Sequence, residues 1–162
     1  MDKSIPEERL REGLDRIIRE VTEASAGISL IRGEAALGEH ICTVHIGFRG
    51  GFHSSLSLRA DAALFARMAQ SVLKGEEHIT IQDLEDVAKE YFNVLCGHIA
   101  AALYKSTHVS ARFSVPSFHW GSYSPEDHRE QFVIRYSSGL NEAAELVHHI
   151  PVPQEGDEAG KT

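Results

Sequence analysis

The order of helical and extended segments limits the fold of this chain more than any other feature. A helical period over residues 4–24 is followed by alternating, strand-like patterns up to residue 60. Two helical segments come next, at 61–75 and from about residue 82 to 106, and extended patterns return from residue 109. Because helices and strands are grouped rather than alternating, we predict an α+β fold, with a mostly antiparallel sheet and two long helices packed on one face.

Alternating side chains and turn residues locate the strands. The segment HICTVHIGF alternates residue by residue, the RGG at 49–51 is a hairpin turn signal, and FHSSLSLRA alternates again. The pattern of residues 145–150 is ambiguous, and the turn residues Gly139 and Asn141 favour a returning strand there. The expected strands are 27–33, 41–48, 52–60, 109–121 (as one strand or as two divided at Pro116), 130–139 and 145–150.

Length and composition indicate one globular domain. The 162 residues are 42% hydrophobic and 25% charged, which suits a single sizeable core. We place the domain at residues 1–150 and expect residues 151–162, which are polar, acidic and rich in glycine, to form a disordered tail. The formal net charge of -8 argues against binding to nucleic acid or to an anionic membrane, because both require basic surface.

The sequence does not show the patterns of a membrane or exported protein. No apolar stretch reaches the length of about 18 residues that indicates a transmembrane helix, and the first residues contain no apolar signal core. We therefore expect a cytoplasmic protein without membrane insertion. Cys42 and Cys96 lie in apolar surroundings and are expected to be reduced, buried thiols, with a disulfide between them as the alternative.

The long helix predicted from about residue 82 has two different faces. At about 100° per residue, apolar side chains gather around Leu84 and polar or small ones gather on the opposite side. The apolar stripe comprises Leu84, Val87, Ala88, Tyr91, Leu95, His98, Ile99 and Ala102. The opposite cluster comprises Asp86, Glu90, Asn93 and Gly97, flanked by Ala100 and Ala101. Because His98 falls within the stripe, we expect it to be a hydrogen-bonded core histidine.

The opposite cluster contains residues that helices normally avoid. An ordinary solvated face would account for Glu90 and Asn93, since exposed polar residues are the rule. Asparagine is nevertheless a poor helix former, and Gly97 costs about 1 kcal/mol relative to alanine in a helix interior. The next turn then carries Ala100 and Ala101. A polar pair beside a small, flat surface suits the close approach of another macromolecule.

Around this pair the sequence resembles the CheX/CheC group of chemotaxis phosphatases, most closely the single-site CheX type. The signature of that group, E-x-x-N on a long helix followed by small residues that include glycine, appears here as EYFNVLCGHIAAAL. The segment IGFRGGFHSSLSLRADAALFARMAQSVLKGE is similar to the hairpin, strand and helix before the signature, and FSVPSFHWGS to the strand-proline-strand segment after it. The resemblance covers residues 28–138 and implies a CheX-like fold.

The resemblance also implies an activity, hydrolysis of the phosphoaspartate of a CheY-type response regulator. Asn93 would enter the regulator's active site and orient the attacking water, because an amide donates and accepts hydrogen bonds without carrying charge. Glu90 would bind the regulator's active-site lysine through a charge-assisted contact. From the helical wheel we expect the surrounding docking surface to consist of Asp86, Gly97, Ala100 and Ala101.

The resemblance implies no cofactor or metal of the chain's own, because the divalent metal belongs to the partner regulator, and it implies a homodimer. The alternative function is a non-catalytic interaction or assembly module of the same fold, which would bind a response regulator or a motor-switch component. The histidines do not suggest a metal site, since the adjacent His148 and His149 point to opposite faces of a strand. Cys96 lies beside the candidate surface and is not expected to be a catalytic thiol.

Overall fold

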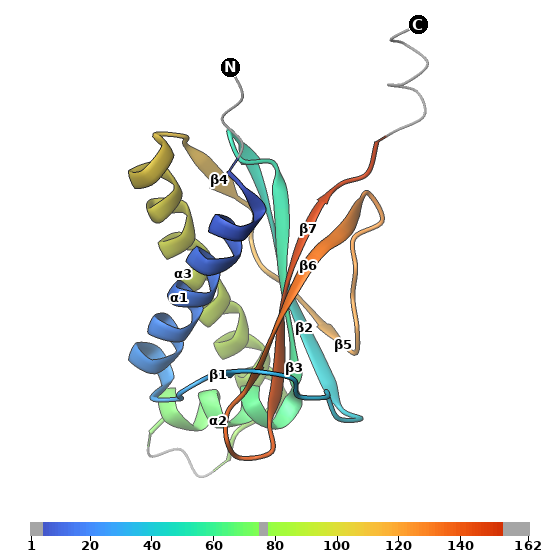
Figure 1. Cartoon of the computed structure of the whole chain (residues 1–162). Coiled ribbons are helices and arrows are strands. Elements are labelled where there is room, and N and C mark those ends of the chain that lie inside the picture. The colour runs from blue at the N-terminus through green and yellow to red at the C-terminus, as the bar shows by residue number, and fades with distance from the viewer. Residues whose placement is uncertain (1–4, 75–77, 154–162) are drawn as a thin grey trace, which may run out of the picture.

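The computed structural model of the chain describes residues 5–74 and 78–153. Three helices and seven strands follow one another in the grouped order that the sequence predicts (Figure 1). The elements are α1 (Glu7–Ala26), β1 (Ile31–Arg32), β2 (Ile41–Gly50), β3 (Ser54–Asp61), α2 (Ala62–Val72), α3 (Ile81–Thr107), β4 (Ala111–Phe113), β5 (Ser117–Trp120), β6 (His128–Ser137) and β7 (Ala143–Pro151).

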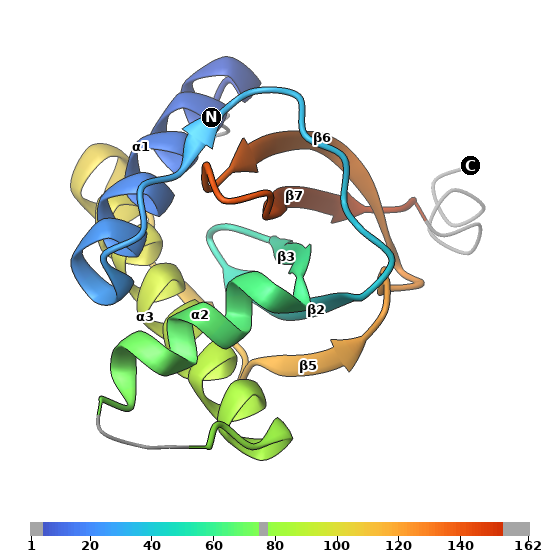
Figure 2. The ribbon, with the colours of Figure 1, turned by 90° about the horizontal axis from the view of Figure 1, so that it is seen from below.

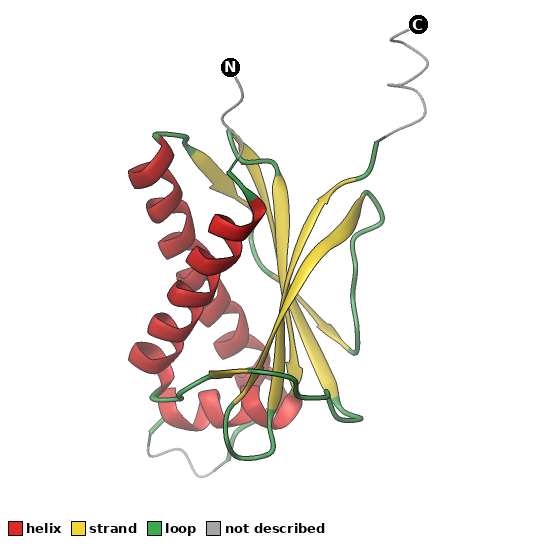
Figure 3. Cartoon of the chain, in the orientation of Figure 1, coloured by secondary structure: helices red, strands yellow, loops and turns green. Residues whose placement is uncertain are grey.

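All the strands belong to one antiparallel sheet. The strand order is β1-β6-β7-β3-β2-β4, and β5 also pairs with β2. The two long helices, α1 and α3, lie on one face of this sheet, and the shorter α2 lies across its lower end (Figure 3). Seen from below, the strands follow one another in the order β6, β7, β3, β2 and β5, and α1 and α3 lie to one side of them (Figure 2). The predicted α+β architecture is therefore confirmed.

Several predicted boundaries are confirmed and others are wrong. The helix α1 begins at Glu7, directly after Pro6, rather than at residue 4, and the strand predicted at 27–33 is reduced to Ile31–Arg32. Four strands follow α3, because Pro116 separates β4 from β5. The sequence also offers Ser4 as an N-cap and Gly75 as a helix stop, and both lie outside the described residues. Of the tail predicted at 151–162, Pro151 belongs to β7, and residues 154–162 lie outside the described residues.

The sequence offers Asp61 as the N-cap of the helix at 61–75 and Thr80 or Asp83 as the cap of the long helix. Asp61 stands at the N-cap of α2 but makes no capping bond, because its carboxylate accepts hydrogen bonds from the backbone of Gly38 and Ala143 at 2.7 and 2.8 Å. The cap of α3 is a complete capping box, in which Thr80 accepts from the Asp83 backbone and Asp83 accepts from the Thr80 backbone, both at 3.0 Å. This box gives the longest helix a defined first turn.

The buried face of α3 lies between the sheet and α1. Its fully or nearly fully buried residues are Leu84, Ala88, Tyr91, Phe92, Leu95, Cys96, Ile99 and Leu103. The prediction for His98 is wrong, because its side chain is exposed, whereas Phe92 and Cys96 are buried. The buried sector is rotated by roughly 50° from the one centred on Leu84, because α3 packs against β2, β4 and β5 and also against both α1 and α2.

The two cysteines are free and buried, as predicted. Cys42 faces the helices from β2, and Cys96 faces the sheet from α3, both within the same hydrophobic core. Among the described residues, no helix is long and apolar enough to cross a membrane.

A buried hydrogen bond ties α3 to α1. Thr22 donates to the backbone carbonyl of Ile18 at 2.6 Å, so its oxygen remains free to accept a hydrogen bond from the Tyr91 hydroxyl, also at 2.6 Å. Burial raises the pKa of Tyr91, so this hydroxyl keeps its proton. The contact fixes the rotation of α3 next to Glu90.

We expect Tyr91→Phe to lower the free energy of unfolding by about 1–3 kcal/mol, because the buried Thr22 oxygen loses its donor. Urea denaturation followed by circular dichroism measures the change. The matched control is Tyr104→Phe in the same helix, where the tyrosine is 56% exposed and the same change should have no measurable effect. Equal effects of the two changes would contradict the assigned role of the Thr22–Tyr91 hydrogen bond.

His148 and His149 point to opposite faces of β7, as predicted. The His148 ring lies on the helix side between Phe52 and Phe132, with ring centroids 5.9 and 5.1 Å away. His149 lies on the other side, where its Nε2 is 3.0 Å from the Ser57 hydroxyl, which in turn is 2.7 Å from His45 Nδ1. Burial is the main cause that lowers the pKa of His45, His148 and His149 to about 4.

These lowered pKa values predict acid sensitivity. Between pH 6.5 and 4 the unfolded chain binds protons that the folded chain excludes, so stability is complete above about pH 6.5 and decreases towards pH 4. For His148 alone the loss amounts to about 3 kcal/mol. We expect His148→Phe, which keeps the aromatic stack, to remove that part of the pH dependence.

Urea denaturation at pH 7.5, 5.5 and 4.5 tests this prediction. The control is His108→Asn, an exposed C-cap position at φ 56°, a left-handed conformation that asparagine accepts. This control should retain the full acid sensitivity of the native chain. An unchanged pH profile in His148→Phe would show that His148 does not contribute to it.

Candidate functional site

The helix α3 and the β4–β5 segment together form an open hollow on the surface. Its volume is about 410 Å³. One wall carries Glu90 and Asn93, which face the same direction because they are three residues apart on a helix. The other wall is formed by the segment 113–116, which leaves β4 and turns at proline towards β5. The full lining is Asp86, Lys89, Glu90, Asn93, Phe113, Ser114, Val115 and Pro116.

The polar side chains of this wall differ in whether they already bond to another residue of the protein. Asp86 accepts a hydrogen bond from Gln82 at 2.8 Å, and Lys89 lies 3.7 Å from Glu85 in an i,i+4 ion pair. Glu90 is exposed and Asn93 half-buried. Within the described part of the chain, neither of these two side chains has a hydrogen bond or ion pair with another residue. Both are therefore available to a partner.

The small residues after the pair have more than one structural role. A Cβ atom added at Gly97 would meet the Phe113 ring at 4.0 Å, an ordinary van der Waals distance, so this glycine lies beside the chain's own β4. Ala100 is half-buried and packs against the core, whereas Ala101 is exposed. Gly97 and Ala100 thus help β4 and the core to approach α3, and their role in docking stays a prediction.

The structure adds site residues that the sequence reasoning missed. Val115 is 85% exposed and stands on the rim of the hollow, close to Glu90 and Asn93. The available signal was the Val-Pro pair between two strand patterns, where a valine has no strand neighbour to cover it. An exposed apolar side chain beside two free polar ones is typical of a contact surface rather than of a closed catalytic pocket.

A second, apolar hollow lies on the other side of Glu90. It has a volume of about 230 Å³ and is lined by Ser25, Ala26, Met68, Val72, Asp86, Val87, Glu90, Tyr91 and Val94. Asp86 and Glu90 therefore form a ridge between the two hollows. This arrangement could not be read from the sequence, because the lining comes from three separate helices.

The side chains of this site are suited to positioning a reacting group of a partner. Cys96 lies next to these residues in sequence but is buried in the core, where burial raises the pKa of its thiol, so it stays protonated. In residues 5–74 and 78–153, no group of three or more His, Cys, Asp and Glu side chains is arranged to hold a metal ion. What the surface offers is a carboxylate and an amide on a rigid helix.

Comparison with known proteins matches residues 42–136 to the family model described as chemotaxis phosphatase CheX. A comparison with curated proteins gives no match. The matched range includes nearly all of the hairpin β2–β3 and of β6, and the elements between them. It therefore contains Asp86 and Glu90, which line both hollows.

Three solved structures illustrate the fold. Chemotaxis protein CheX from Vibrio vulnificus has a TM-score of 0.72 at 15% identity, covering 91% of this chain and 97% of that one. A chain of the CheX–CheY–BeF3–Mg2+ complex from Borrelia burgdorferi has a TM-score of 0.71 at 15% identity, with 88% and 98% covered. A chain of the FliG–FliM complex from H. pylori has a TM-score of 0.59 at 7% identity, with 91% and 95% covered.

At these identities the structural likeness establishes the fold, and the family model establishes the family. The match spans more than half of the chain and includes the helix that carries Glu90 and Asn93. The chain therefore belongs to the CheX family of chemotaxis phosphatases.

Proposed function

We propose that this chain hydrolyses the phosphoaspartate of a phosphorylated CheY-type response regulator. The observation that carries the proposal is the pair Glu90 and Asn93, which share one wall of the hollow and have no partner among the described residues. Membership of the CheX family and the fold shared with a chain of a CheX–CheY complex support the same assignment.

Asn93 is the proposed catalytic residue. Its amide enters the regulator's active site, accepts a hydrogen bond from the attacking water and donates one to a neighbouring oxygen. The position lies in the middle of α3, whose first turn is fixed by the capping box and whose buried side is fixed by the core. Catalysis then comes from placing the water in line with the acyl phosphate, and a carboxylate in this position would be repelled by the phosphoryl oxygens.

Glu90 is the proposed docking residue. One turn before Asn93 on the same face, its exposed carboxylate pairs with the lysine of the regulator's active site and sets the register of the helix. Asp86 lies one turn further towards the start of α3 and adds negative charge to the same ridge. Gly97, Ala100 and Ala101 are proposed to keep the following turn low enough for a partner to approach.

The divalent metal of the reaction is proposed to belong to the regulator. The charge of the phosphoryl group in the transition state is then stabilised by that metal and by the regulator's lysine, and this chain supplies orientation. We also infer, from the resemblance, that the protein acts as a homodimer in the cytoplasm.

A non-catalytic binding module is the second candidate. The same fold occurs in a chain of the FliG–FliM complex, which favours a role in binding a motor-switch component. Such a module would hold a partner on the same ridge without accelerating hydrolysis. The two candidates differ in phosphate release and not in binding.

We expect Asn93→Ala to reduce the rate of phosphate release by about 100-fold, because the attacking water loses its orienting group. Glu90→Ala should weaken binding to the phosphorylated regulator, since the lysine loses its partner. Phosphate release from a panel of phosphorylated CheY-type regulators, measured with binding to the same regulators, separates the two effects.

Lys105→Ala, at an exposed position near the end of α3, is the matched control and should behave like the native chain. Binding of a regulator without any acceleration of release by the native chain would overturn the phosphatase and leave the binding module. Normal release by Asn93→Ala would remove Asn93 from the mechanism.

The exposed valine on the rim gives an independent prediction. Val115→Asp should weaken regulator binding by about tenfold, because an apolar contact is replaced by a charge beside the acidic ridge. The fold should be unaffected, since Val115 is 85% exposed. Leu140→Asp, at a 62% exposed position in the β6–β7 turn, is the control and should leave binding unchanged. Equal binding by both variants would place the contact surface elsewhere.

A further inference from the structure

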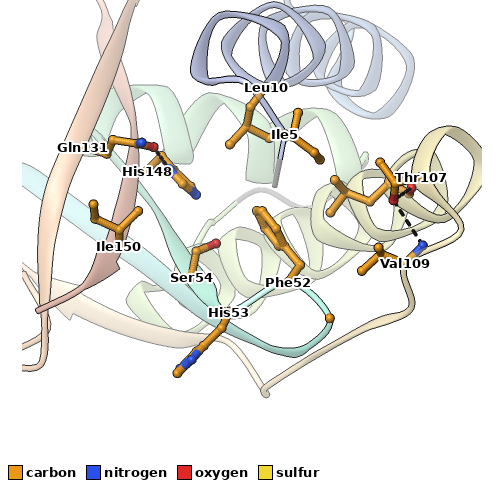
Figure 4. A pocket seen from close by; sticks show the side chains of 12 residues that line it. Ile5, Leu10, Phe52, His53, Ser54, Thr107, Val109, Gln131, His148 and Ile150 are labelled. Carbon is orange, nitrogen blue, oxygen red and sulfur yellow. Dashed lines mark hydrogen bonds between the residues drawn. The ribbon is translucent and has the colours of Figure 1, made fainter. Parts of the chain in front are cut away.

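A third hollow lies at the opposite end of α3 from its first turn. Its volume is about 420 Å³, and it opens between the first turns of α1, the end of α3, the β2–β3 turn and the strands β6 and β7 (Figure 4). Asn93 is ten residues before Leu103, so the site is about 15 Å along the helix from the proposed phosphatase residues. The lining is Ile5, Leu10, Gly51, Phe52, His53, Ser54, Leu103, Thr107, Val109, Gln131, His148 and Ile150.

His148 is held in one orientation and one protonation state. Its Nδ1 donates to Gln131 Oε1 at 2.7 Å, and its ring is stacked between Phe52 and Phe132. Burial lowers the pKa of His148 to about 4, so the ring is neutral at physiological pH. With the proton on Nδ1, the Nε2 atom carries a lone pair and can only accept a hydrogen bond.

Two polar atoms on this wall have no partner. His148 Nε2 and Ser54 Oγ are both buried and unbonded, and each of the two residues is only 3% exposed. Figure 4 shows the imidazole and the hydroxyl on neighbouring strands, with their ends turned towards the inside of the hollow. Unpaired buried polar atoms cost about 1–3 kcal/mol each, so a group that pairs with them gains affinity.

The remaining lining determines what kind of molecule fits. Among the described residues, no aspartate, glutamate, lysine or arginine lines the hollow. Apolar side chains, among them Leu10, Phe52 and Ile150, form part of the wall, and polar atoms form the rest. A charged molecule would lose hydration there without meeting a fixed opposite charge. An uncharged molecule with an apolar body loses much less hydration free energy on entering the hollow.

We propose that this hollow binds a small uncharged molecule that carries a hydroxyl or amide group on an apolar body. The polar group donates to His148 Nε2 and accepts from the Ser54 hydroxyl, and the body packs against Leu10, Phe52 and Ile150. Each of the two atoms exposes less than 1 Å² in this structure, so the side chains around them must shift when the molecule binds. The volume lies within the range of about 300–1,000 Å³ that is usual for small-molecule sites. This inference is independent of the phosphatase assignment, because it uses neither Glu90 nor Asn93.

Benzamide, benzoate and toluene provide matched probes. The first carries an uncharged amide on an apolar ring, the second replaces the amide by a charge, and the third has no polar group. The test is to titrate each probe into the isotopically labelled protein and to follow backbone and histidine signals by nuclear magnetic resonance. Benzamide should cause saturable shifts centred on Ser54, Gln131 and His148, and should bind at least about tenfold more tightly than either other probe, a ratio that corresponds to about 1.4 kcal/mol.

Two variants test the polar contacts. His148→Phe keeps the aromatic stack and Ser54→Ala removes only the hydroxyl, so each should weaken benzamide binding by about tenfold. His108→Asn, at an exposed position outside the hollow, should bind benzamide like the native chain. The two variants are independent, so a folding defect in one leaves the other as the test.

Three results would overturn the proposal. Benzamide could fail to cause saturable shifts up to its solubility limit, benzoate could bind at these residues as tightly as benzamide, or binding could survive in the folded variants. None of these outcomes depends on phosphate release, so the result is separate from the test of the proposed function.

Discussion

The packing of α3 against the sheet, α1 and α2 is the interaction on which the rest of the structure depends. Phe92, Leu95 and Ile99 are almost completely buried, and the Thr22–Tyr91 hydrogen bond sets the rotation of the helix about its axis. Because one side of α3 is held in this way, the opposite side is presented to solvent in a fixed orientation. Glu90 and Asn93 lie on that side, so the core determines the direction in which they point.

The same packing gives each part of α3 different surroundings. Its first half stands between an apolar hollow and the hollow beside Val115, where exposed polar and apolar side chains lie next to one another and suit a protein partner. Its last turns close one side of the hollow that contains Ser54 and His148, where uncharged polar and apolar side chains together form the wall and suit a small molecule. One rigid helix thus connects a proposed contact surface with a proposed ligand site.

The histidines on β7 show that neighbouring residues in a strand serve separate environments. His148 belongs to the helix side, where it stacks between Phe52 and Phe132, and His149 belongs to the opposite side, where it meets Ser57 and His45. Both rings are kept neutral by burial, so acid weakens the sheet from its two faces at once. The active form of the protein is therefore expected at neutral pH.

The sequence by itself determined the α+β class, the positions of most elements and the shared direction of Glu90 and Asn93, because these follow from local periodicity and turn residues. It did not determine which sector of α3 is buried: His98 is exposed and Phe92 is buried, since the sheet and α1 jointly decide that rotation. The hollow beside Val115 and the placement of Ser54 and His148 on one wall were decided only by the tertiary structure. Their residues are distant in the chain, and only strand register and helix packing bring them together.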